Sequence, residues 1–259
     1  MFSISISPAQ VISFTVVLFR VAGIMVFAPF YSGSAFPVQV KVILPLLVAL
    51  TLAPVVPQAQ LPSEYGLLQV ITSVLGEILI GMVLGLVASF IFGALQLAGQ
   101  IMGFQLGFSI INVMDPQTSV EISVISILNN FIGLVLFLLI NGHQWFFLAV
   151  SESLSYLPVG GVRLNGPLVE EVLRLSSRIF ASGLRIAGPV VAVTIISDIV
   201  VGLIGRAAHQ VNILIVGMPV KTLVGLVALS IAFYFLPAFL GASFLQLSRD
   251  LMGLVHGMK

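Results

Sequence analysis

The chain has 259 residues, of which 59% are hydrophobic and only 7% are charged. An ordinary soluble domain has about 25% charged residues, so this chain has too few charges to cover a surface that faces water. The net charge is +1 and cysteine is absent, which argues against a basic nucleic-acid surface, disulfides and thiolate chemistry. The composition predicts an all-α polytopic membrane protein.

Six apolar runs approach the length needed to cross a bilayer, which is roughly 20 helical residues for about 30 Å of hydrocarbon. They occupy residues 9–28, 38–56, 67–97, 120–140, 179–203 and 220–247. The first basic residue is Arg20, so the first run lacks the charged n-region of a signal peptide and is expected to stay in the mature protein. We therefore expect about six long apolar helices.

The third run is the longest, and as a helix it would span ~45 Å, which exceeds the hydrocarbon thickness. Such a helix must tilt, kink, or leave the bilayer under a cover of protein. Small residues recur in it at every fourth position: Gly81, Gly85, Ser89 and Gly93. The spacing predicts a ridge where another helix backbone comes close, although glycine is also common in membrane helices without such a role.

Two stretches between the runs have amphipathic character. Residues 142–157 carry four aromatic side chains that suit a membrane interface. Asn165-Gly166-Pro167 is typical of a helix start, with a cap residue followed by proline in the first turn. Glu170 and Arg174 follow four positions apart, as in a helical ion pair. We expect a helix in solvent or headgroups before the fifth run.

Charged residues inside apolar runs cost roughly 2.5–3.5 kcal/mol each at a helix centre on insertion scales. Five charges are expected to be buried in this way: Arg20, Glu77, Arg185, Asp198 and Arg206. They would either form an ion or proton pathway or pair with one another and with partner subunits. One acid in the third run and one in the fifth make a sparse relay, so the sequence favours structural pairing.

No motif in the chain predicts catalysis. His143, His209 and His256 are far apart and have no carboxylate at metal-ligand spacing, so no metal site is expected. A nucleophile elbow, a phosphate-binding loop and a dinucleotide fingerprint are all missing from the sequence. Asp198 is the one aspartate inside an apolar run, which leaves no aspartate pair for an intramembrane protease. We expect no enzyme, no catalytic residue and no cofactor.

The most unusual stretch is residues 99–116, between the third and fourth runs. It combines glycines at four-residue spacing with glutamine, phenylalanine and methionine, and it ends in Asp115-Pro116, a turn signal. Non-helical backbone at membrane depth is tolerated only when it is buried in protein or lines a water-filled cavity. The residues alone leave two interpretations open: a plug with bulky apolar tips on a glycine hinge, or an ordinary apolar surface loop.

Several short motifs stand in a distinctive order and spacing. They are Gln96-Leu97-Ala98-Gly99-Gln100-Ile101, Asp115-Pro116, Leu136-Phe137-Leu138 with Asn141-Gly142-His143, Arg206-Ala207-Ala208, Gln210-Val211-Asn212 and Gly217-Met218-Pro219-Val220-Lys221. In this order they resemble the FliR family, the export-gate subunits of flagella and their virulence-system counterparts in type III secretion. The likeness extends over nearly the whole chain.

The resemblance implies one membrane domain, residues 1–259, that is a structural, channel-forming subunit of the flagellar protein export gate. Residues 1–165 would be arranged like a FliP subunit and residues 166–259 like a helical hairpin of FliQ. The partners implied are FliP and FliQ subunits, FlhB at the channel entrance, and the unfolded flagellar proteins that pass through. The implied location is the inner membrane at the flagellar basal body, with no nucleic acid, metal or cofactor.

In this family the loop between the third and fourth runs closes the pore, so the resemblance implies a plug at residues 103–117. Its residues are Gly103, Phe104, Gly107, Phe108, Ile110, Ile111, Met114, Asp115 and Pro116. The resemblance makes Phe104, Phe108, Ile110 and Ile111 the occluding side chains. One departure is His209, which stands where the family usually has proline, so the kink that proline imposes is not expected from this residue.

Two other functions stay open at this point, a virulence-type counterpart and a stand-alone secondary transporter. A transporter would bind its substrate near the membrane midplane at broken helices, and Pro45, Pro189 and Pro237 are candidate breaks. It would purify as a monomer or homo-oligomer. An export-gate subunit would co-purify with two other small membrane proteins.

Overall fold

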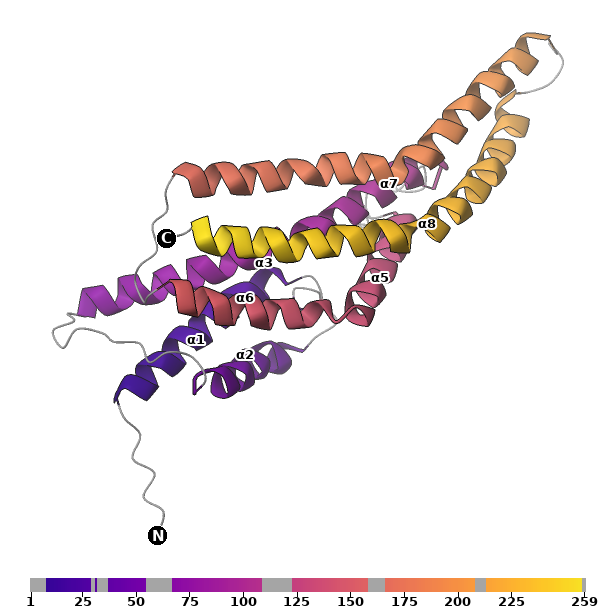
Figure 1. Ribbon diagram of the computed structural model, residues 1–259. Coiled ribbons are helices and arrows are strands. Elements are labelled where there is room, and N and C mark those ends of the chain that lie inside the picture. The colour runs from indigo at the N-terminus through magenta and orange to yellow at the C-terminus, as the bar shows by residue number, and fades with distance from the viewer. Residues whose placement is uncertain are drawn as a thin grey trace. The chain divides into compact units, whose positions relative to one another are not determined.

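The computed structural model describes residues 8–28, 31, 37–54, 67–108, 123–157, 166–207 and 213–257. Within them the chain is almost entirely helical (Figure 1). The helices are α1 (Pro8–Phe27), α2 (Val38–Leu52), α3 (Leu67–Gln105), α5 (Val124–Leu139), α6 (Gly142–Tyr156), α7 (Gly166–Ala207) and α8 (Ile213–Gly257). The described residues contain no strand, and the predicted all-α membrane class is confirmed.

Four helices are long and apolar enough to cross a membrane, namely α1, α3, α7 and α8. A fifth span results if α5 and α6 are counted as one broken span. The second predicted run forms α2, which has only 15 residues and reaches roughly 22 Å at about 1.5 Å per residue. The described residues therefore do not contain six full-length spans, because the helix formed by the second apolar run is too short to cross a bilayer.

Three helices are longer than the sequence suggested. Helix α3 has 39 residues and continues eight residues beyond the predicted end of the third run. Helix α7 joins the predicted amphipathic helix and the fifth run into 42 residues, and it begins at Gly166 as the turn chemistry predicted. Helix α8 has 45 residues. Helices α2, α7 and α8 continue through Pro45, Pro189 and Pro237, so the described backbone is not broken at these prolines.

The chain divides into two compact units. The first unit comprises Met1–Phe90, Leu138–Ser176 and Phe244–Lys259. In it α1 contacts α2 and α6, and α1 crosses α3 at a very short distance. A Cβ atom added at Gly81 would lie 2.1 Å from the carbonyl oxygen of Arg20, and one added at Gly85 would lie 2.4 Å from that of Ile24. Only glycine permits this backbone contact.

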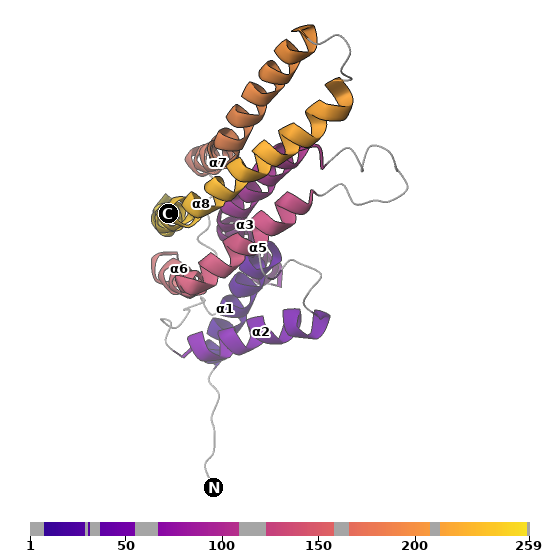
Figure 2. The same cartoon turned by 90° about the vertical axis from the view of Figure 1, so that its right-hand side faces the viewer.

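The second unit comprises Ile91–Phe137 and Ser177–Ser243. Its core is built from α3, α5, α7 and α8. The buried residues of this core are Ala98, Met102, Leu106, Ile125, Ala187, Val190, Ala228 and Leu229. In both views α7 and α8 run side by side within this unit (Figure 2). Each unit contains residues from both sides of residue 165.

Helix α5 packs against α3 in the second unit through a polar strip inside an apolar interface. Ser126 donates a hydrogen bond to the carbonyl of Gln96 at 2.8 Å, and Asn129 donates one to the carbonyl of Leu95 at 3.2 Å. Gly99 lies against the backbone of Ser126, where a Cβ atom would come within 2.3 Å. This close approach explains why glycine is needed at position 99 of α3, where a side chain would not fit.

Candidate functional site

The carboxyl end of α3, residues 103–108, is the part of the predicted plug that the structure describes, and we call it the α3 terminus. Its backbone forms two hydrogen bonds that end the helix: Phe108 N–H donates to the carbonyl of Gly103 at 3.0 Å, and Gly107 N–H donates to that of Phe104 at 3.1 Å. Gly107 has a φ of 84°, a left-handed conformation that glycine adopts without strain. Together these features make a Schellman cap, which terminates the helix at a defined point.

The α3 terminus is anchored on α8. Leu106 is buried in the core of the second unit, and its side chain lies over Gly225, where a Cβ atom would come within 2.1 Å of Leu106 Cδ2. The hydroxyl of Thr222 donates to the carbonyl of Leu106 at 3.2 Å and to that of Met218 at 3.0 Å. This hydroxyl supplies a donor to one of the carbonyls that a helix leaves unpaired at its end.

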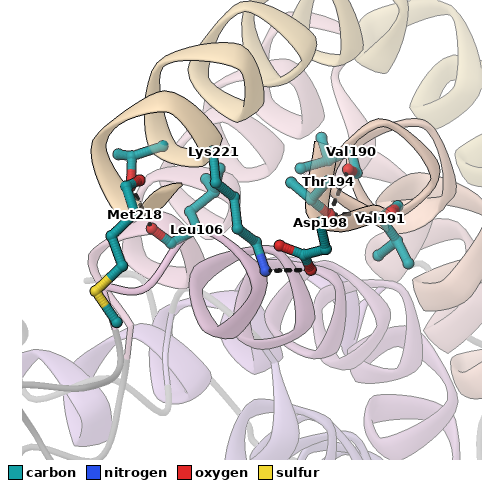
Figure 3. A network of polar contacts seen from close by, with 8 residues as sticks. Leu106, Val190, Val191, Thr194, Asp198, Met218 and Lys221 are labelled. Atoms are coloured by element: carbon teal, nitrogen blue, oxygen red, sulfur yellow. Dashed lines mark hydrogen bonds and ion pairs between the residues drawn. The ribbon is translucent and has the colours of Figure 1, made fainter. Parts of the chain in front are cut away.

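An ion pair lies beside this anchor and links α7 to α8. Lys221 Nζ contacts Asp198 Oδ2 at 2.7 Å (Figure 3). The Asp198 side chain is 50% exposed and that of Lys221 is 23% exposed. One turn before Asp198, the buried hydroxyl of Thr194 bonds to carbonyls of its own helix, those of Val190 and Val191, both at 2.9 Å. An exposed pair of this kind contributes little to stability in water, about 0–1 kcal/mol.

The α3 terminus and the ion pair border one hollow of about 500 Å³. Its lining residues are Phe104, Gln105, Leu106, Gly107, Phe108, Asp198, Val201, Gly202, Gly217, Met218, Lys221 and Thr222. A second hollow of about 370 Å³ lies between α7 and α8 and is lined almost wholly by apolar side chains. The two hollows thus differ in character, because only the first contains charged groups.

The predicted plug residues have different positions. Gly103 is buried and helical, inside α3. Phe104 is 73% exposed and Phe108 is 38% exposed. Gly107 forms the cap described above. The other predicted plug residues lie outside the described part of the chain: Ile110, Ile111, Met114, Asp115 and Pro116.

Two of the five predicted buried charges pair in the core of the first unit. Arg20 of α1 and Glu77 of α3 are both fully buried, and Arg20 Nε donates to Glu77 Oε2 at 2.6 Å. Arg20 NH1 also donates to Ser153 Oγ of α6 at 3.0 Å, and that hydroxyl donates to the carbonyl of Val150 at 2.8 Å. One arginine therefore joins three helices that are distant in sequence.

The other three predicted buried charges are exposed on α7 within this chain. They are Arg185, Asp198 and Arg206. Their exposure follows from the packing of α7, which buries only the face that carries Ala187, Val190 and Thr194. Asp198 has a partner in Lys221, which the sequence analysis did not count among the charges of the apolar runs.

The predicted small-residue ridge contacts two different neighbours. Gly81 and Gly85 lie against the backbone of α1 in the first unit. Ser89 donates to the carbonyl of Leu86 in its own helix at 2.6 Å. A Cβ atom at Gly93, in the second unit, would lie at an ordinary 3.7 Å from the side chain of Ile179. The close backbone approach is thus limited to the first half of the ridge.

Comparison with known proteins identifies the family. Residues 11–247 match the family described as bacterial export proteins, family 1. The flagellar biosynthetic protein FliR of Escherichia coli (strain K12) is 31% identical over 211 residues, which cover 81% of this chain and 79% of that protein. The chain belongs to the FliR family of bacterial export proteins.

More distant members of the FliR family support the same assignment. FliR of Pectobacterium carotovorum subsp. carotovorum is 28% identical over 222 residues, which cover 85% of this chain and 84% of that protein. FliR of Bacillus subtilis (strain 168) is 26% identical over 223 residues, 84% of either chain. The resemblance stated from the short motifs is therefore confirmed. The family match also covers the whole α3 terminus and its anchor on α8.

Sequence reasoning missed several residues that the structure brings together in this FliR family member. Thr222 and Gly225 of α8 and Ser153 of α6 were not predicted to have a role, although each contacts a predicted site residue or its neighbour. Lys221 had one usable signal, since it and Asp198 are opposite charges inside apolar stretches. The described residues contain no group of three or more histidines, aspartates or glutamates that could hold a metal ion.

Proposed function

We propose that this chain is a structural, channel-forming subunit of the flagellar type III protein export gate in the bacterial inner membrane. The observation that carries the proposal is membership of the FliR family, whose similar members are named flagellar biosynthetic proteins. Flagellar names among these relatives favour a flagellar over a virulence system. The proposal includes unfolded flagellar proteins as the transported substrates.

The partners in this proposal are FliP-like and FliQ-like membrane subunits, with FlhB at the entrance. Support comes from the apolar surface of α7 and α8. Only 17% of the most apolar stretch of α7 is buried within the chain, against 50% in α3. Its exposed large side chains include Ile195, Ile196, Ile199, Val200, Leu203 and Ile204. Such a surface needs lipid or a partner protein to cover it.

The division into a FliP-like part, residues 1–165, and a FliQ-like part, residues 166–259, belongs to the same proposal. It is supported by α7 and α8, which are two long helices that run antiparallel within the second unit. The plug at residues 103–117 is also part of the proposal. Two of its aromatic side chains, Phe104 and Phe108, are exposed at the end of a firmly capped helix, as occluding groups would need to be.

A clean in-frame deletion tests the main proposal. We expect the deletion strain to lose filament assembly, motility and secretion of filament components, and a plasmid copy of the gene to restore all three. The measurements are motility in soft agar and detection of filament protein in the culture medium. Secretion that persists in the deletion strain would refute the proposal.

Purification tests the partners, and leak tests the plug. A tagged chain should co-purify with two other small membrane proteins, whereas a stand-alone transporter would purify as a monomer or homo-oligomer.

Removing residues 103–107 or replacing Phe108 with alanine should raise ion conductance through the assembled gate. Conductance equal to that of the unchanged gate in both variants would contradict the plug assignment.

A further inference from the structure

We infer that Thr222 and Gly225 of α8 are positioning residues, which seat the α3 terminus and thereby hold the aromatic side chains Phe104 and Phe108 in place. The inference rests on the proposed function. It adds the groups that hold the α3 terminus, where the proposed plug begins. It uses only residues 103–108 of α3 and their contacts with α8. Neither Thr222 nor Gly225 belongs to the predicted plug.

We call the surface formed by Thr222 and Gly225 of α8 the seat. Its first contribution is its shape. Leu106 is almost completely buried, and its Cδ2 atom occupies the space where any side chain at position 225 would begin, 2.1 Å from an added Cβ. A Cβ there would also meet Thr194 Cγ2 at 3.2 Å. Protein cores are close-packed and accept extra atoms only if neighbours move. Glycine at position 225 therefore provides the flat surface onto which Leu106 fits.

The second part of the seat is a hydrogen bond. Leu106 is the C-cap residue of α3, so its carbonyl has no N–H partner further along the helix. The single hydroxyl proton of Thr222 is shared between this carbonyl, at 3.2 Å, and that of Met218 one turn before it in α8, at 3.0 Å. An unsatisfied carbonyl in apolar surroundings is costly, so the hydroxyl favours the docked position of the α3 terminus over any displaced one.

The seat determines where the aromatic side chains stand. Phe104 and Phe108 lie two residues to either side of Leu106, and the two cap hydrogen bonds fix the backbone that joins all three. Both rings border the hollow that also contains Asp198 and Lys221. Because the two cap hydrogen bonds join Phe104 and Phe108 to the same short backbone segment as Leu106, a movement of that segment away from α8 carries both rings with it.

The hydroxyl is tested with two substitutions at one position in the full assembled gate. Thr222→Val keeps the shape and removes the donor, and Thr222→Ser keeps the donor. Loss of one hydrogen bond of ordinary net strength shifts an equilibrium by roughly fivefold. We expect Thr222→Val to raise proton leak about that much in vesicles that carry the gate, read with a pH-sensitive dye, and Thr222→Ser to restore the unchanged leak.

The shape of the seat is tested with a matched pair of glycines in α8. Gly225→Ala forces the terminal Cδ2 methyl of Leu106 to leave its place and crowds Thr194 Cγ2 at 3.2 Å, whereas Gly241→Ala adds a Cβ with no atom within 4 Å. Both changes alter helix propensity equally, so only the first should raise the leak, by at least the factor seen for Thr222→Val. Leak is compared at equal amounts of assembled gate. Equal leak in the two alanine variants, or in Thr222→Val and Thr222→Ser, overturns the inference.

A covalent bond tests whether the seat stays occupied. The chain has no cysteine of its own, so Leu106→Cys with Gly225→Cys gives one possible intramolecular disulfide. We expect a mild oxidant to form it in the assembled gate, and secretion to continue at the level of the reduced form. Failure to form the disulfide, or a block of secretion that reductant relieves, overturns the inference. Absence of secretion from the unsubstituted chain would instead overturn the proposed function.

Discussion

The buried pair of Arg20 and Glu77 makes the sharpest stability prediction for this chain. Both side chains are fully buried, and the guanidinium also bonds to Ser153. Glu77→Gln keeps the shape but removes the negative charge, which leaves a buried arginine without its counter-ion. Removing one partner of such a pair costs about 3–5 kcal/mol. This loss should appear as a clear fall in the Tm of the gate.

The assay is thermal unfolding of the purified gate, followed by loss of the intact complex on size-exclusion chromatography after heating. The double variant Arg20→Met with Glu77→Leu should recover most of the Tm, because apolar residues of similar volume replace buried ion pairs with little loss. Arg174→Met is the matched control at the exposed pair of Arg174 and Glu171, before the apolar stretch of α7, where we expect a change of at most about 1 kcal/mol.

Two outcomes would refute this reasoning. The first is a Tm for Glu77→Gln equal to that of the Arg174→Met control. The second is a double variant as unstable as the single one, which would mean that shape rather than charge decides stability at this position.

Three further substitutions have expected outcomes. Gly81→Leu places a side chain on the carbonyl of Arg20, where even a Cβ comes within 2.1 Å, and should abolish accumulation of the gate on immunoblots, whereas Gly188→Leu, with no atom within 4 Å of a Cβ, should not. Asn129→Ala removes the side-chain donor that joins α5 to the carbonyl of Leu95 in α3, a carbonyl that keeps its own helix hydrogen bond, and should lower stability by about 0.5–1.5 kcal/mol in the thermal assay; an unchanged Tm would contradict the contact. Pro189→Ala restores a helix hydrogen bond at an exposed position inside α7 and should raise Tm, by at most about 3 kcal/mol of added stability.

Much of the fold could be predicted because its signals are local. The first apolar run matches α1 closely, and the cap and proline around Gly166 mark the start of α7. The end of α3 was placed too early, since Gly99 and Gly103 were interpreted as loop glycines. Gly99 is instead required by the backbone of Ser126, 27 residues later in the sequence. A Cβ atom at position 99 would lie only 2.3 Å from Ser126 Cα. Local patterns cannot distinguish these two uses of glycine.

The candidate site was predictable only in part, for a similar reason. The cost of charge in apolar surroundings singles out Arg20 and Glu77 but does not say that they meet each other, or that Ser153 completes the site. Thr222 and Gly225 belong to residue types that are frequent in membrane helices, so nothing in their own neighbourhood marks them. Their role depends on Leu106, which lies more than 100 positions earlier in the chain.

The buried pair also constrains the order of events during synthesis. Arg20 is synthesised 57 residues before Glu77, so the carboxylate with which it pairs in the folded chain is not yet present when α1 emerges. A lone arginine at the centre of a helix disfavours insertion by roughly 2.5–3.5 kcal/mol. The pair that buries this charge can therefore form only after α3 has been made, since α3 carries both the carboxylate and the glycines that admit α1. A helix made later in synthesis thus supplies the contacts that an earlier helix needs for its buried charge.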